Sequence, residues 1–117
     1  MGKMIVERSF DFALSITKMS DHFAHSIAGD VVVKVVRSGT SVGANVEEVQ
    51  AGYTKDDFTY KMNTALKEAR ETHYWLRLAR ASGMLTADHV DEIIAEADEI
   101  KRMLGAIVTT SRKVNDR

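Results

Sequence analysis

Residues 54–83 read TKDDFTYKMNTALKEARETHYWLRLARASG, and this stretch decides the fold. Small and apolar residues recur along it in alternating steps of four and three: Phe58, Met62, Ala65, Ala69, Thr72, Leu76 and Ala79. That spacing is typical of a helix in a left-handed bundle. Thr54 is a good N-cap, with Asp57 in place of the longer Glu or Gln of a capping box, and Gly83 marks the end. The stretch predicts a long helix over residues 55–82.

The residues before this stretch predict two more helices. In the first, over about residues 4–25, apolar residues share one face at steps of four, three and four: Phe12, Ile16, Met19 and Phe23. The second is expected over about residues 31–51, with Asp30 as its N-cap and Gly52 closing it. Its many valines could instead form a strand, but the flanking Ala, Glu and Gln residues favour a helix.

A fourth helix is expected over about residues 87–112, capped by Thr86. Its apolar residues again follow helical spacing: Val90, Ile93, Ile94, Ala97, Ile100, Leu104, Ile107 and Val108. The 117 residues contain no proline, so little interrupts these helices. Short connections between long helices make neighbours antiparallel. The sequence therefore predicts an all-α, up-down-up-down antiparallel four-helix bundle that forms a single domain over residues 1–117.

Composition excludes several classes of protein. Hydrophobic residues make up 44% and charged residues 28% of the chain, which is typical of a folded domain rather than a disordered segment. Unbroken apolar runs are far shorter than the roughly 20 residues of a membrane span. Cysteine is absent, which excludes disulfides and thiolate chemistry. The first residues do not follow the pattern of a secretory signal, so we expect a cytoplasmic protein.

Patterns that carry chemistry are missing from the sequence. No His has Glu three residues before it, as carboxylate-bridged metal sites in helical bundles require, and neither a Gly-x-Ser-x-Gly elbow nor a phosphate-binding loop occurs. His22 and His25 share a helix face and could hold zinc or copper in a metal-dependent enzyme, although a surface pair is the simpler interpretation. His73 and Trp75 could bind a ligand or pack between helices. We predict no catalytic residue, metal or cofactor.

The unusual segment is RSGTSVGANVEE, residues 37–48. Glycine inside a helix costs about 1 kcal/mol relative to Ala, and two glycines four residues apart let another helix come close. That helix could belong to the same chain or to another subunit, and side chains on an adjacent track could hydrogen-bond across the contact. Two glutamates of the third helix share a face, and one of them could pair with the arginine. The residues singled out as structural or interfacial are Arg37, Gly39, Ser41, Gly43, Asn45, Glu47, Glu68 and Glu71.

The charge pattern gives a weaker indication of nucleic-acid binding. The formal net charge is −1, so no overall field draws the chain to RNA or DNA. Residues 86–100 carry acidic side chains and no Lys or Arg, whereas residues 101–117 are mainly basic, an order that complements the dipole of a helix. Candidate nucleic-acid contacts are Lys34, Lys61, Lys101, Arg102, Arg112 and Lys113.

Three segments together resemble a known family. Residues 37–48, residues 54–58 (TKDDF) and residues 65–72 (ALKEARET) are similar to the four-helix-bundle proteins encoded in intervening sequences of bacterial 23S ribosomal RNA. This family is also called the S23 ribosomal protein family, and the accessory variability protein of diversity-generating retroelements resembles it. The resemblance covers about residues 10–110 and rests on the order and spacing of all three segments.

The resemblance implies an antiparallel bundle that assembles as a ring, commonly a homopentamer, with residues 37–48 and 67–71 structural or interfacial. For the retroelement relative it implies binding of nucleic acid and a reverse transcriptase through a basic surface, and this slightly acidic chain departs from that pattern. Our first hypothesis is a noncatalytic homo-oligomeric scaffold or binding module. The alternative is an RNA- or DNA-binding accessory protein, and the third hypothesis is the metal-dependent enzyme.

Overall fold

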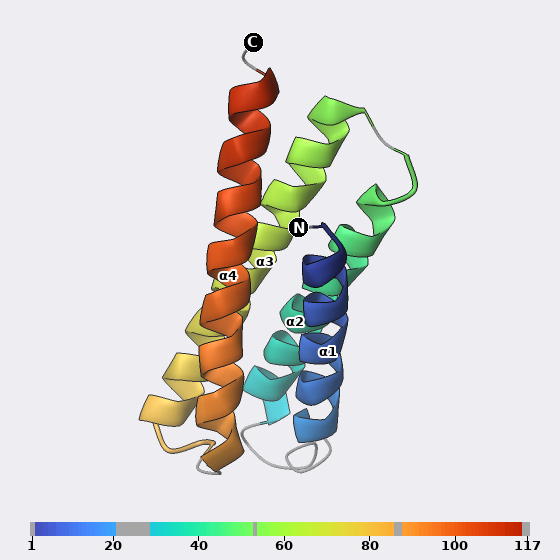
Figure 1. Ribbon diagram of the computed structural model, residues 1–117. Coiled ribbons are helices and arrows are strands. Elements are labelled where there is room, and N and C mark those ends of the chain that lie inside the picture. The colour runs from blue at the N-terminus through green and yellow to red at the C-terminus, as the bar shows by residue number, and fades with distance from the viewer. Residues whose placement is uncertain (1, 21–28, 53, 86–87, 116–117) are drawn as a thin grey trace.

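The computed structural model describes residues 2–20, 29–52, 54–85 and 88–115. They form four helices: α1 (Gly2–Ser20), α2 (Gly29–Val49), α3 (Lys55–Ala81) and α4 (Asp88–Asn115). Figure 1 shows that consecutive helices run in opposite directions, so the predicted all-α antiparallel bundle is confirmed. The valine-rich segment is helical, and the described residues contain no strand. None of the helices within these ranges is long and apolar enough to span a membrane.

Helix α3 begins where its sequence predicts. The Thr54 hydroxyl oxygen accepts a hydrogen bond from the Asp57 backbone N–H at 3.2 Å, which satisfies a donor of the first helical turn. The Asp57 carboxylate in turn accepts a hydrogen bond from the Thr54 hydroxyl at 2.8 Å. Aspartate, which is shorter than the Glu or Gln of a capping box, therefore contacts the side chain of the cap residue. Gly83 follows the helix with φ of 83°, a left-handed conformation that glycine adopts at low cost.

The other helix ends differ from the sequence expectations. Helix α2 already includes Gly29, so Asp30 lies in its first turn rather than at the N-cap, where it still complements the helix dipole. The helix ends at Val49, and Gly52 with φ of 103° reverses the chain three residues later. Helix α4 continues to Asn115, beyond the expected residue 112. The end of the expected first helix, with Phe23, and the expected cap Thr86 lie outside the described residues.

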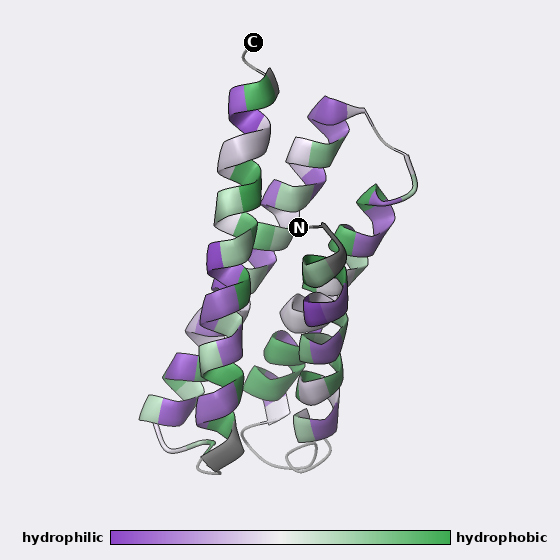
Figure 2. Cartoon of the chain, in the orientation of Figure 1, coloured by the Kyte–Doolittle hydropathy of each residue, from purple (hydrophilic) through white to green (hydrophobic). Residues whose placement is uncertain are grey.

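The core runs along the centre of the bundle. Helix α1 packs against α2 and α4, and α3 packs against the same two helices. Hydrophilic and hydrophobic residues alternate within each helix, as one buried and one exposed face require (Figure 2). The seam of α3 faces inward as expected, because Phe58 is half-buried and the remaining seam residues are buried. The largest fully buried side chains include Phe12, Ile16, Met62, Leu76, Ile100 and Leu104.

A hydroxyl pair crosses the buried contact between α2 and α3. The Thr72 and Ser38 side chains are almost fully buried, and their hydroxyl oxygens lie 2.7 Å apart. The Ser38 hydroxyl donates to the Lys34 carbonyl, and the single proton of the Thr72 hydroxyl has two acceptors within reach, the Ser38 oxygen and the Glu68 carbonyl. These polar atoms therefore all have partners, and the pair fixes how α2 and α3 lie along one another.

Candidate anion-binding groove between α3 and α4

A groove of about 360 Å³ lies between α3 and α4. It is lined by Leu66, Arg70, His73, Arg77, Lys101 and Gly105. The four residues from α3 follow one another in steps of four, three and four, and the two from α4 are four residues apart. Such spacings keep side chains on one face of a helix. Two antiparallel helices thus bring three cations and an imidazole to one place.

Positive charge in the groove exceeds negative charge. Arg70 and Arg77 are exposed and form no ion pair with any residue in the described ranges. The neighbouring carboxylate of Asp98 lies 3.0 Å from the Lys101 ammonium and 2.9 Å from the Arg102 guanidinium. The hydrogen bond from Lys101, together with the charges of both cations, lowers the pKa of Asp98. One carboxylate is therefore shared between two cations, and the charges of the two α3 arginines are not compensated.

His73 contributes a neutral hydrogen-bonding group. Its Nε2 atom lies 4.0 Å from the Asp98 carboxylate, and only 14% of its side chain is exposed. Burial lowers the pKa of His73, and the charges of Lys101 and Arg77 lower it further, while Asp98 acts in the opposite direction. The imidazole is therefore neutral at pH 7 and can donate one N–H.

Gly105 keeps the groove open. A Cβ atom built on this residue would meet no atom within 4 Å, so packing does not require glycine here. Glycine in the interior of a helix nevertheless costs about 1 kcal/mol relative to Ala. The residue with no side chain lies on the groove wall, where any larger side chain would extend into the open space.

The six basic residues predicted to contact nucleic acid do not form one surface. On the α2–α3 side, the Lys34 ammonium lies 5.3 Å from the centre of the Trp75 ring, and the Lys61 ammonium lies 3.1 Å from the Glu48 carboxylate. Lys101 lines the groove between α3 and α4. The other three, Arg102, Arg112 and Lys113, are exposed along α4, with Arg102 paired to Asp98.

Sequence reasoning missed Arg70 and Arg77, which supply most of the positive charge in the groove. The signal was available, because the two arginines are seven residues apart and therefore lie two turns apart on one side of α3. The spacing of the two arginines does not indicate that Lys101 of α4 lies opposite them.

The two glycines singled out in α2 pack against α1 of the same chain. A Cβ on Gly39 would clash with the Ile16 side chain, and a Cβ on Gly43 would lie 3.2 Å from the Ser9 carbonyl oxygen. Their small size thus serves a contact within the bundle, one of the two alternatives that the sequence left open. On the adjacent track, the Asn45 amide donates to the Ser41 carbonyl at 2.8 Å, so this hydrogen bond runs along α2 itself.

The remaining residues of that set lie on the outer side of α2 and α3. Arg37 and Glu47 are exposed, and Glu68 is half-buried. Burial raises the pKa of Glu68, the charge of Glu71 raises it further, and Arg37 acts in the opposite direction. Arg37 is therefore close enough to attract Glu68, although the described residues show no ion pair between Arg37 and either glutamate. Glu71 instead accepts a hydrogen bond from the Trp75 indole at 3.1 Å.

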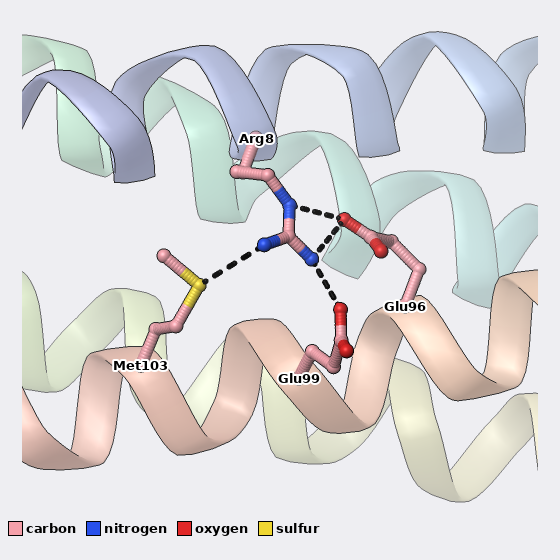
Figure 3. Close-up of polar contacts among 4 residues, drawn as sticks. All are labelled: Arg8, Glu96, Glu99 and Met103. Carbon is pink, nitrogen blue, oxygen red and sulfur yellow. Dashed lines mark hydrogen bonds and ion pairs between the residues drawn. The ribbon is translucent and has the colours of Figure 1, made fainter.

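A second polar cluster joins α1 to α4 (Figure 3). The Arg8 guanidinium donates to Glu96 at 2.8 Å and to Glu99 at 2.5 Å, and a third nitrogen approaches the Met103 sulfur at 3.6 Å. These hydrogen bonds raise the pKa of Arg8 far above its usual value. The three α4 residues follow helical spacing, but the sequence does not say which helix faces them. This cluster carries one positive and two negative charges, and it links α1 to α4.

Metal binding has no support in the residues that the structure describes. Within them, no group of three or more His, Asp or Glu side chains could hold a metal ion. His22 and His25, on which the metal hypothesis depends, lie outside the described residues.

Comparison with known proteins identifies the family of this chain. Residues 3–106 match the model of the family described as 23S rRNA-intervening sequence protein. A crystal structure of a protein of unknown function from the S23 ribosomal protein family of Bacteroides thetaiotaomicron is similar to this chain, with a TM-score of 0.83 and 31% identity over 92% of this chain and 97% of that one. No curated protein matches the sequence. The chain belongs to the family of 23S rRNA-intervening sequence proteins.

Proposed function

We propose that this protein is a noncatalytic homo-oligomer that acts as a scaffold or binding module in the cytoplasm. The proposed assembly is the five-membered ring that the family resemblance implies. The observation that carries the proposal is that α1 exposes large apolar side chains on its outer surface. Phe10 is 58% exposed and Leu14 is 44% exposed, and the two are four residues apart on one side of the helix.

Helix α1 is apolar on two sides. Phe12 and Ile16 face the core, whereas Phe10 and Leu14 face outward, and Met4 is also largely exposed. Exposed apolar patches commonly mark interaction surfaces. Covering this surface with a second copy of the chain would remove the side chains from water. Burial of these exposed apolar side chains would therefore favour assembly through α1.

Light scattering of the purified protein tests the assembly. A pentamer has five times the chain mass of 13.0 kDa, and a monomer would contradict the proposal. Replacing Phe10 and Leu14 together by Ser should shift the mass towards that of a monomer. The matched control is Val114→Ser, which changes a residue that is also 44% exposed but lies near the end of α4. Equal effects of the two changes would show that α1 is not the contact.

The noncatalytic part of the proposal rests on the missing catalytic patterns described above, and turnover of any substrate by the pure protein would contradict it. Nucleic-acid binding remains the alternative function. It has less support, because the net charge is −1 and the six candidate basic residues do not form one surface. Retention on RNA that falls steeply between low and moderate salt would favour this alternative, since phosphate contacts release counterions.

A further inference from the structure

We propose that the groove between α3 and α4 is a binding site for a phosphate group. Arg70 and Arg77 would hold the phosphate oxygens, Lys101 would add a third positive charge, and the neutral His73 would donate a hydrogen bond. The site is built within one chain, so it does not depend on the assembly proposed above.

The charges favour an anion over a neutral ligand. Three cations line the groove, and the nearby carboxylate of Asp98 is engaged by Lys101 and Arg102. Exposed arginines commonly find a carboxylate nearby, yet Arg70 and Arg77 have no such partner in the described part of the chain. An anion in the groove would supply the missing partner for both of them.

The chemistry of the cations favours phosphate. A guanidinium presents paired N–H groups that match two oxygens of one phosphate, and an ammonium acts as a point charge beside it. Arg70 and Arg77 are seven residues apart, which separates their Cα atoms by about 10 Å along the helix axis. Their long side chains can therefore approach one ligand from both ends. Lys101 reaches the same space from the opposite wall.

The shape of the groove favours a small ligand group. Its volume of about 360 Å³ is near the lower end of typical small-molecule sites, about 300–1,000 Å³. Leu66 is buried and supplies an apolar lining, while Gly105 leaves open space where a side chain would otherwise project. This space suits a phosphate with a compact organic portion. The phosphate could come from a free metabolite or from the backbone of a nucleic acid, and the recognition chemistry is the same.

Calorimetric titration with inorganic pyrophosphate at low salt tests the site. We expect saturable binding at one site per chain, weakened at least ten-fold in Arg70→Gln and in Arg77→Gln. Gly105→Leu should abolish binding, because the new side chain would extend into the groove. The space around a Cβ atom at this position is open, and circular dichroism of the variant checks that it stays folded. The matched control for loss of one charge is Lys18→Gln, an exposed residue of α1.

Competition with a short single-stranded RNA distinguishes the two sources of phosphate. If RNA displaces pyrophosphate, and if Arg70→Gln, Arg77→Gln and Gly105→Leu also lose RNA binding, the phosphate belongs to a nucleic acid. If only pyrophosphate depends on these residues, the ligand is a free phosphate compound. No saturable binding of either probe, or an equal loss in Lys18→Gln, would overturn the proposal.

Discussion

The contact between α1 and α2 and the groove between α3 and α4 use glycine in opposite ways. Gly39 and Gly43 are buried, and their missing side chains are replaced by Ile16 and by the Ser9 backbone. Gly105 also lies inside a long helix, but nothing occupies the space beside it. Where a neighbouring helix fills the space beside a glycine, the glycine allows close packing. Where that space is empty, as beside Gly105 and the three cations, the glycine leaves the groove open. The surroundings of a glycine, rather than its place in a helix, indicate its role.

The largest expected effect comes from Gly43→Leu. The nearest atoms belong to the Ser9 backbone, which cannot rotate away as a side chain can, so α1 must shift outward. We expect a loss of about 3 kcal/mol in the free energy of unfolding, the upper end for an overpacked core. Urea unfolding measures this loss, and Gly105→Leu is the matched change that should not cause it. If Gly43→Leu is as stable as the native protein, the space beside Gly43 is not closely packed, and Gly43 and Gly105 do not differ in this respect.

Gly105→Ala should have a smaller effect of opposite sign. The added methyl group meets open space, so the change in helix propensity should stabilise the protein by about 1 kcal/mol. Thermal unfolding should show a higher Tm for this variant. A lower Tm would mean that the helix needs glycine at this position for a reason other than ligand access.

The comparison extends to the two sides of α4. Facing α1, Glu96 and Glu99 form ion pairs with Arg8, whereas Arg70 and Arg77 in the groove on the α3 side form none with any described residue. Arg8→Gln should lower the free energy of unfolding by about 1 kcal/mol, because the Arg8 side chain is 31% exposed and exposed ion pairs contribute little. A double-mutant cycle with Glu96→Gln measures the coupling. Additive effects of the two changes would show that the pair does not join the helices.

The smallest expected effect concerns pH and His73. Burial lowers the pKa of His73 below the ordinary value of a histidine, the charges of Lys101 and Arg77 lower it further, and Asp98 acts in the opposite direction. Unfolded chains therefore bind more protons near pH 6, and the contribution of His73 to stability is present above pH 6.5 and lost below it.

In urea unfolding at pH 7.5 and 5.5, His73→Gln should lose less stability than the native protein as the pH falls. The loss seen in the native protein should also shrink when pyrophosphate is present, since a bound anion raises the pKa of His73. A native protein with the same pH dependence as His73→Gln would contradict a buried, cation-flanked imidazole.

The sequence was sufficient for the fold because its apolar pattern is periodic. The steps of four and three in residues 58–79 specify the buried face of α3, and the Thr54 cap specifies its start. The surroundings of the glycines could not be read in the same way. Gly43 and Gly105 both interrupt helical segments, and only the position of a neighbouring helix decides whether the space beside them is filled.

The candidate site was less predictable than the fold. Arg70 and Arg77 meet Lys101 because α3 and α4 are antiparallel neighbours in one particular register, and no local pattern contains that information. The Arg8 cluster has the same origin, since its partners lie about 90 residues away in the sequence. The carboxylates beside two candidate nucleic-acid contacts, Glu48 beside Lys61 and Asp98 beside Arg102, show which charges meet in the fold.

The Ser38 and Thr72 hydroxyls have a consequence for how the chain folds. Because each hydroxyl already has a carbonyl partner within its own helix, α2 and α3 can lose water along their contact without leaving a donor unsatisfied. Their connection spans only a few residues, so the entropy lost on closing it is small. The short connection and the satisfied hydroxyls both favour the antiparallel pairing of α2 with α3.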